Sequence, residues 1–107
     1  MTSGHPAQAV RKFRLRKAED GIREVTPELA ALWLEGNFHN RRLNESRVAE
    51  YVQKMLTGGW KERCGPPIEL LDDGGLWNGQ HRLTAVVRAG LSVRMRVVVY
   101  EKVTVQG

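Results

Sequence analysis

Residues 68–90 of this 107-residue chain read IELLDDGGLWNGQHRLTAVVRAG and decide the fold. The apolar run at 68–71 predicts a strand, the two aspartates and two glycines after it predict a tight turn, and Leu76-Trp77 predicts the returning strand. A helix is expected from Gln80 to Ala89, closed by Gly90. Its inward-facing residues have helical spacing: Leu83, Val86 and Val87.

The segment after this helix alternates between apolar and polar residues, so residues 93–100 predict another strand. The apolar residues share one face: Val93, Met95, Val97 and Val99. Arg94 and Arg96 belong to the other face. Such alternation is typical of a strand with one buried side.

Two helices are expected before residues 68–90. Thr26 and Pro27 form a helix start, because threonine caps the first amides and proline suits the first helical position. The inward residues of this helix are Leu29, Leu32 and Trp33, and Gly36 ends it. A second helix runs from about Glu45 to Thr57 and is capped by Asn44. Its inward residues follow the spacing of one helix face: Val48, Tyr51, Val52, Met55 and Leu56.

The chain before these helices is expected to be less regular. Short strands are predicted around residues 13–15 and 22–25, with a turn at Glu19-Asp20-Gly21 between them. Residues 1–18 are predicted to be a flexible basic N-terminal arm and residues 19–107 a single domain. Together the elements predict an α+β fold, a small mixed β-sheet with about three helices.

The positive charge of the chain is concentrated near its start. Lysines and arginines number 17 against 12 aspartates and glutamates, which gives a formal net charge of +5. Five of the basic residues lie close together, and the rest of the chain is formally neutral: Arg11, Lys12, Arg14, Arg16 and Lys17. A local basic cluster is typical of a segment that binds nucleic acid. A solvated arm that only aids solubility is the open alternative.

Cysteine content and hydropathy favour a cytoplasmic protein. The single cysteine, Cys64, cannot form an internal disulfide, and we interpret it as an ordinary thiol in a reducing compartment. No apolar run approaches the roughly 20 residues that a membrane-spanning helix needs. Residues 1–10 lack the apolar core of a signal peptide. No membrane partner is expected.

The chemistry is expected where the returning strand meets the helix, at Gly79-Gln80-His81-Arg82. The first amides of a helix have no acceptor within it, and the helix dipole is positive there. Gly79 lets an anion approach the backbone, and Arg82 offers a two-pronged guanidinium group for phosphate oxygens. Gln80 and His81 add donors. The segment therefore predicts a phosphate site, with a simple turn beside a surface arginine as the alternative.

Residues 67–99, which hold this segment inside a strand–turn–strand–helix unit, resemble the ParB/sulfiredoxin superfamily. The likeness extends upstream to Asn40-Arg41-Arg42-Leu43 and to Gly59-Trp60, so that it covers about residues 22 to 100. The chain is particularly similar to small stand-alone ParB-like proteins of bacteriophages and actinobacteria. The resemblance implies that a nucleoside triphosphate, CTP or ATP with Mg²⁺, is bound by Gly79, Gln80, His81 and Arg82, with Asn40 and Arg42 as second contacts.

The motif departs from both branches of the superfamily. ParB proteins have Gly-Glu-Arg-Arg in this place, so Gln80 replaces a carboxylate, and glutamine is a poor magnesium ligand and no base. Sulfiredoxins have Gly-Cys-His-Arg, so Gln80 also replaces their nucleophile, and sulfiredoxin activity is not expected. The chain stops without the helix-turn-helix and dimerisation domains of chromosome-segregating ParB proteins. Recognition of a centromere site is therefore not expected.

Three hypotheses of function follow. The leading one is a nucleotide- or phosphate-binding module associated with DNA transactions. The second is a ParB-like metal-dependent nuclease or nucleotide hydrolase, with His81 as acid or base and with Glu69 and Asp73 as weak metal candidates. Turn chemistry explains Asp73 equally well, so no metal site is assigned. The third is a phage-encoded module that inhibits or redirects a host protein.

The role of the three tryptophans is a separate question. Aromatic side chains stack on bases in single-strand binders. Core packing is nevertheless the favoured interpretation of each of them: Trp33, Trp60 and Trp77.

Overall fold

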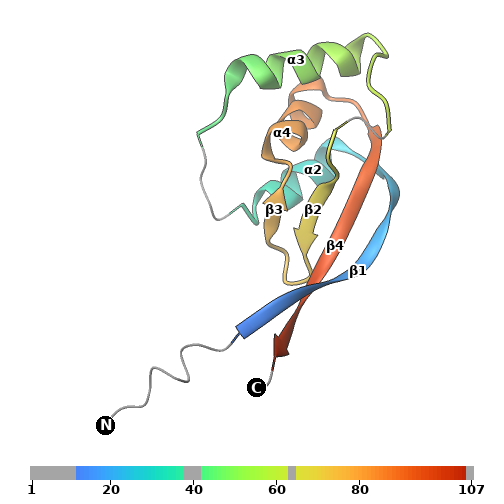
Figure 1. Cartoon of the computed structure of the whole chain (residues 1–107). Helices are drawn as coiled ribbons and strands as arrows, with labels where there is room; N and C mark the ends of the chain where they lie inside the picture. Colours follow the sequence, from blue (N-terminus) through green and yellow to red (C-terminus); the bar gives the residue numbers. More distant parts are fainter. Residues whose placement is uncertain (1–11, 38–41, 63–64, 106–107) are drawn as a thin grey trace.

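The computed structural model describes residues 12–37, 42–62 and 65–105, and of Lys12 only the backbone. Within them lie four strands and three helices (Figure 1). In chain order they are β1 (Lys12–Val25), α2 (Pro27–Leu34), α3 (Glu45–Leu56), β2 (Ile68–Leu71), β3 (Leu76–Asn78), α4 (Gln80–Ala89) and β4 (Val93–Val105). The predicted α+β class is confirmed, and the ParB/sulfiredoxin-like fold within it stays a prediction. No helix in the described segments is long and apolar enough to cross a membrane.

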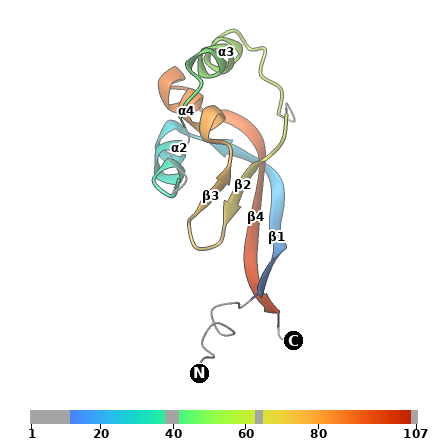
Figure 2. The ribbon, with the colours of Figure 1, turned by 60° about the vertical axis from the view of Figure 1, so that its left-hand side comes forward.

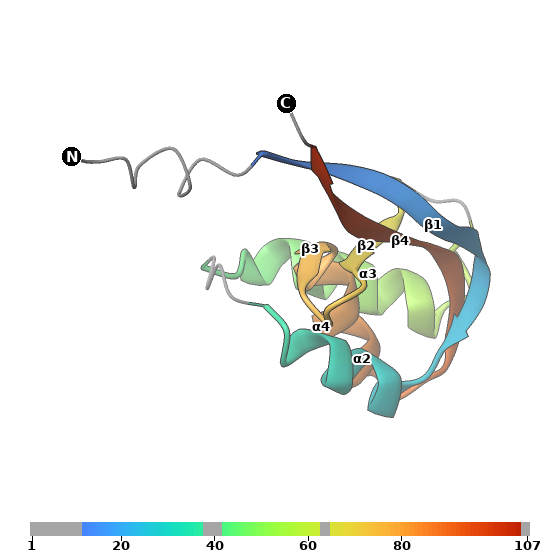
Figure 3. The same ribbon diagram turned by 90° about the horizontal axis from the view of Figure 1, so that it is seen from below.

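The four strands form one mixed sheet in the order β1-β4-β2-β3. β2 runs parallel to β4, and the other neighbouring pairs are antiparallel. The three described helices lie on one face of this sheet and leave its other face open (Figure 2, Figure 3). The hydrophobic core lies between the two layers. Its largest fully buried residues come from both: Val25, Val48, Ile68, Leu83, Val86 and Val97.

Two predicted helix starts are confirmed by their caps. The Thr26 hydroxyl accepts a hydrogen bond from the Leu29 amide at 3.0 Å, and the Asn44 carboxamide oxygen accepts one from the Arg47 amide at 3.0 Å. Each side chain satisfies an amide that the helix itself cannot. α4 begins differently, at Gly79, and has no side-chain cap.

The predicted inward faces of the helices are confirmed in part. Leu83 and Val86 are buried on α4, but three other residues predicted to face inward are exposed: Leu32, Leu56 and Val87. α4 packs against both α2 and α3, so its buried stripe centres on residues 82–86 and excludes Val87. α2 buries Ala30 in place of Leu32, and Leu56 is the last residue of α3.

β1 differs most from its predicted structure. The residues expected to form two short strands and a turn are one strand of 14 residues. It pairs with β4 along its whole length, with a bulge between Lys17 and Glu19. The turn predicted at residues 19–21 is therefore wrong. The flexible arm predicted for residues 1–18 is wrong for residues 12–18, and residues 1–11 lie outside the described part of the chain.

The physical reason lies in β4, which continues to Val105 and gives the first half of β1 a partner. Arg16 forms an ion pair with Glu101, which lies directly opposite on β4. The Asp20 carboxylate accepts two hydrogen bonds from Arg96, both of 2.8 Å, and one of 3.0 Å from Lys17. The two pairs that join the strands, Arg16 with Glu101 and Asp20 with Arg96, outweigh the local preference of residues 19–21 for a turn.

The stability of the sheet is expected to depend on Asp20 at acid pH. Hydrogen bonds from Arg96 first, and then from Lys17, hold the pKa of Asp20 well below its usual value. The carboxylate therefore stabilises the folded state above its unfolded pKa of about 3.9, and this contribution is lost as the pH falls toward the lower folded pKa. Urea titrations between about pH 5 and pH 2 measure this effect. The free energy of unfolding should decrease less with falling pH in Asp20→Asn than in the wild type. The same is expected of Arg96→Gln, and a wild-type profile in both variants would contradict the pairing.

Candidate functional site

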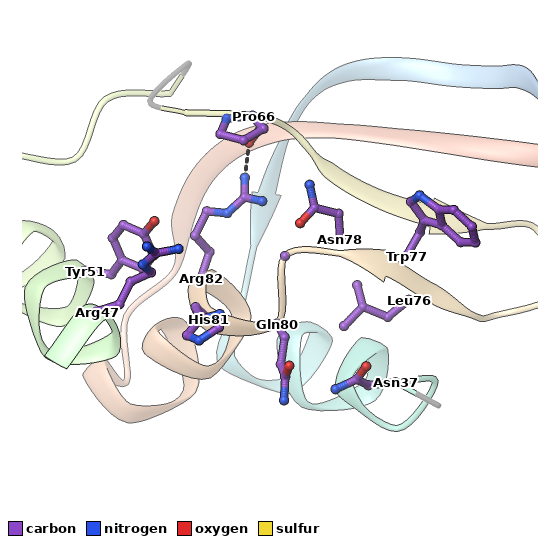
Figure 4. A pocket seen from close by; sticks show the side chains of 11 residues that line it. Asn37, Arg47, Tyr51, Pro66, Leu76, Trp77, Asn78, Gln80, His81 and Arg82 are labelled. Carbon is purple, nitrogen blue, oxygen red and sulfur yellow. Dashed lines mark hydrogen bonds between the residues drawn. The ribbon is translucent and has the colours of Figure 1, made fainter. Parts of the chain in front are cut away.

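A pocket opens where β3 meets α4 (Figure 4). Its volume is about 640 Å³, within the range of ~300–1,000 Å³ that is typical of small-molecule sites. All four residues of the predicted phosphate segment line it. Among the described residues, the lining comes from the chain just after α2, from α3, from the chain before β2, and from β3 and α4: Asn37, Arg47, Tyr51, Pro66, Leu76, Trp77, Asn78, Gly79, Gln80, His81 and Arg82.

Gly79 turns the chain from β3 into α4. Its φ of 124° is a conformation that residues with a side chain rarely adopt. A Cβ at this position would lie 2.6 Å from Ile68 Cδ1. The Gly79 carbonyl accepts the first helical hydrogen bond, from the Leu83 amide at 2.9 Å. A glycine is therefore required here, and it places the first turn of α4 at the pocket wall.

Arg82 is buried beside this turn, with only 7% of its surface exposed. Its guanidinium group donates to the carbonyl oxygens of Pro66 and, at 3.3 Å, of Pro67. The first of these bonds is drawn in Figure 4. The sequence predicted that this group would reach out to a phosphate, whereas in the structure it holds the chain that leads into β2. Because Arg82 also lines the pocket, its positive charge still acts there.

His81 joins the starts of α4 and α3. Its Nε2 accepts a hydrogen bond of 2.9 Å from the backbone N–H of Asn44, the cap residue of α3. A nitrogen that accepts carries no proton, so the proton of the neutral imidazole lies on Nδ1. Since Nε2 is engaged, an acid or base role of His81 would have to use Nδ1.

Arg47 is a lining residue that the sequence did not single out. It lies in the first part of α3, four residues before Tyr51, and both side chains line the pocket. Figure 4 shows them on the α3 side, with Asn78 and Trp77 on the β3 side. Residues four apart share one face of a helix. Because Tyr51 was predicted to face inward, Arg47, one turn before it, could have been predicted to lie on the same side of the helix.

The three tryptophans have different surroundings. Trp33 packs against the core beneath Arg23, whose guanidinium carbon lies 5.3 Å from the ring centroid. Trp60 also packs against the core and meets Tyr51 edge-on, with 5.5 Å between the ring centroids. Core packing is therefore confirmed for these two. It is wrong for Trp77, which lines the pocket and is 53% exposed.

No carboxylate lines the pocket in the part of the chain that the structure describes. Asp73 accepts hydrogen bonds from the Gly75 amide at 2.9 Å and from Lys102 at 3.3 Å, and these bonds lower its pKa. Glu69 accepts one of 3.2 Å from the Asn78 carboxamide. Among the described residues no three metal-ligating side chains gather. Among the described lining residues, a magnesium ion that entered with a nucleotide would therefore meet neutral oxygens, such as the carboxamides of Asn37 and Gln80, and no carboxylate.

Of the other predicted phosphate contacts, Asn40 and Arg42, the structure describes only Arg42. Arg42 is exposed just before α3 and is not a lining residue. Asn40 lies outside the described residues, as does Cys64. Arg47, and not Arg42, is therefore the described arginine that precedes α4 in the chain and lines the pocket.

The three members of the predicted nucleic-acid cluster whose side chains the structure describes do not all lie on one face of β1. Alternation along β1 places Arg14 and Arg16 on one face of the strand and Lys17 on the other. Arg16 is paired with Glu101, and Lys17 with Asp20. Arg11 lies outside the described residues, and so does the side chain of Lys12. Much of the positive charge on this part of β1 is therefore offset by neighbouring carboxylates.

Fold and pocket together define an α+β domain with a cationic pocket at the start of a helix. No protein-family model, curated protein or solved structure matches the chain. The resemblance to the ParB/sulfiredoxin superfamily therefore rests on the sequence motif. A function has to be argued from the pocket itself.

Proposed function

We propose that the protein is a phosphate- and nucleotide-binding module whose binding site is the pocket at the start of α4. The observation that supports this best is the charge of the pocket. Arg47 and Arg82 line it, and no carboxylate does among the described residues. Phosphate is the common ligand of such a place, because it accepts hydrogen bonds from guanidinium groups and is attracted by the positive end of a helix.

The lining groups have different parts in the proposed complex. Gly79 lets the phosphate approach the first turn of α4 closely, and Gln80 offers a carboxamide donor. Arg47 is exposed on α3 and can close on the phosphate from the other side. Arg82 adds charge from its buried position. Arg47 is therefore the arginine whose loss tests binding without loosening the pocket wall.

A nucleoside triphosphate, CTP or ATP, is the proposed form of the ligand, and the ParB/sulfiredoxin resemblance supports it. Hydrolysis is less well supported. Gln80 stands where ParB proteins have a carboxylate, and neither Glu69 nor Asp73 is a lining residue of the pocket. Binding is therefore proposed in preference to a nuclease or hydrolase activity. Two further proposals concern the target of the nucleotide-bound protein. It takes part in DNA transactions, or it inhibits or redirects a host protein.

Substitution of Arg47 is expected to weaken binding about tenfold, the effect of losing one charge-assisted hydrogen bond worth ~1.5 kcal/mol. Isothermal titration calorimetry of Arg47→Ala with CTP, ATP and inorganic tripolyphosphate, with and without Mg²⁺, measures this. The fold should be preserved, since the Asn44 cap bonds the backbone of Arg47 and not its side chain.

The matched control is Arg14→Ala, which removes an exposed arginine on β1 outside the pocket. It should bind like the wild type. A wild-type protein that binds none of the three ligands would contradict the proposal. So would an Arg14→Ala variant that is weakened as much as Arg47→Ala, since the affinity would then come from general surface charge.

A further inference from the structure

The exposure of Trp77 calls for an explanation. Leu76, the preceding residue, is buried, and Trp77 lies on the other side of β3 in the wall of the pocket (Figure 4). About half of the indole surface faces water, although burial of such a ring stabilises a fold more than burial of almost any other side chain. A ligand in the pocket could therefore cover the exposed part of Trp77 and gain apolar contact from it.

The surroundings of Trp77 suit a planar ring. Asn78, the next residue, projects to the same side of β3 in Figure 4. Its carboxamide nitrogen donates to Glu69 Oε1 at 3.2 Å. This bond orients the carboxamide, so that its oxygen is directed away from Glu69. Carboxamides held in a fixed orientation are the groups that proteins use to read the polar edge of a base.

The two ends of the pocket differ in chemistry. Arg47 and Tyr51 lie on the α3 side, whereas Trp77 and Asn78 lie on the β3 side (Figure 4). A volume of about 640 Å³ exceeds what an inorganic phosphate needs. The pocket therefore has room for a phosphate at its cationic side and for an attached group at its aromatic side.

We infer that Trp77 and Asn78 form a ring-binding subsite, so that the ligand is the phosphate ester of a planar heteroaromatic base and not an inorganic phosphate or a sugar phosphate. The base stacks on the exposed indole, and Asn78 contacts the polar edge of the base. This inference rests on the proposed function, because the phosphate anchors the ligand at the Arg47 side. Base stacking on an aromatic side chain is sequence-tolerant, so Trp77 favours bases in general over ligands without a ring.

The test compares ligands that share the phosphates and differ in the ring. Calorimetry compares the affinities of the full chain for CTP and ATP with that for inorganic tripolyphosphate, and those for CMP and AMP with that for ribose 5-phosphate. The wild type should bind at least one nucleotide about tenfold more tightly than tripolyphosphate, the difference that one stacked base contributes. Trp77→Ala should abolish this preference and leave the affinity for tripolyphosphate unchanged. Trp77→Phe, which keeps a stacking ring, should retain most of the preference.

Leu32→Ala serves as the matched control, since it removes another exposed apolar side chain that is outside the pocket lining. It should leave every affinity unchanged. A wild type that binds tripolyphosphate as tightly as nucleotides overturns the ring subsite and leaves the phosphate site standing. A Trp77→Ala variant that keeps the nucleotide preference overturns it as well. A wild type that binds no phosphate compound overturns the proposed function and this inference together.

Discussion

Replacement of Arg82 with alanine is expected to lower the free energy of unfolding by about 3 kcal/mol, a large part of the stability of a small domain. The side chain is 7% exposed, and its guanidinium group donates to the carbonyl oxygens of Pro66 and Pro67. Without it both carbonyls lose a charged donor, and the chain that leads into β2 is no longer tied to α4. The stem of the arginine also fills space beside the core, so a cavity adds to the loss.

Urea denaturation followed by circular dichroism measures this change. Arg82→Lys is the informative companion, because an ammonium group can reach one carbonyl but cannot span two as the guanidinium fork does. It should be intermediate in stability. An Arg82→Ala variant as stable as the wild type would contradict a structural role. The stability of these variants also matters for binding experiments. If Arg82→Ala lost ligand binding, the loss could come either from an unfolded pocket wall or from a missing phosphate contact.

The second large effect is expected at Gly36, just after α2. Gly36 is buried, and a Cβ built there would overlap the backbone carbonyl oxygen of Gly74 in the β2–β3 turn. The Gly36 carbonyl accepts a hydrogen bond of 2.9 Å from the Leu76 amide, which docks the end of α2 on β3. Neither backbone can move without breaking this contact. Gly36→Ala is therefore expected to cost about 3 kcal/mol, as strained overpacking does.

Gly21→Ala is the matched control, because a Cβ at Gly21 in β1 would meet no atom within 4 Å. Thermal and urea unfolding of the two variants should differ widely, with Gly21→Ala close to the wild type. Equal stability of the two variants would contradict the close approach of α2 to the hairpin. Asn37 and Leu76 line the pocket, so Gly36→Ala should also weaken ligand binding.

The elements that the sequence predicted well are those with local causes. The β2–β3 turn forms because Asp73 accepts from the Gly75 amide two residues on, and α2 and α3 begin at side chains that cap amides three residues on. The start of α4 follows from the same logic, since Gly79 lies where a strand must turn into a helix. The position of the phosphate segment in the pocket wall could therefore be predicted from a short stretch of chain.

The features that were missed depend on partners distant in sequence. β1 is a single strand because of pairs such as Arg16 with Glu101, which are 85 residues apart. Arg82 is buried because folding brings the carbonyl of Pro66, 16 residues before it, to its guanidinium group. No pattern in the sequence around Arg82 indicates that folding will bring a carbonyl acceptor to its side chain. The same holds for Arg47, which joins the pocket only because α3 packs against α4.

The central claim is that phosphate binds at the start of α4, and amide spectra of the ¹⁵N-labelled protein test it most directly. Inorganic tripolyphosphate is added stepwise, and the shift of each backbone amide is recorded. The largest shifts are expected at Gly79, Gln80 and His81, with a smaller one at Arg47 across the pocket. Shifts confined to Arg14, Arg16 and Lys17 on β1, or no shifts at millimolar ligand, would contradict the claim.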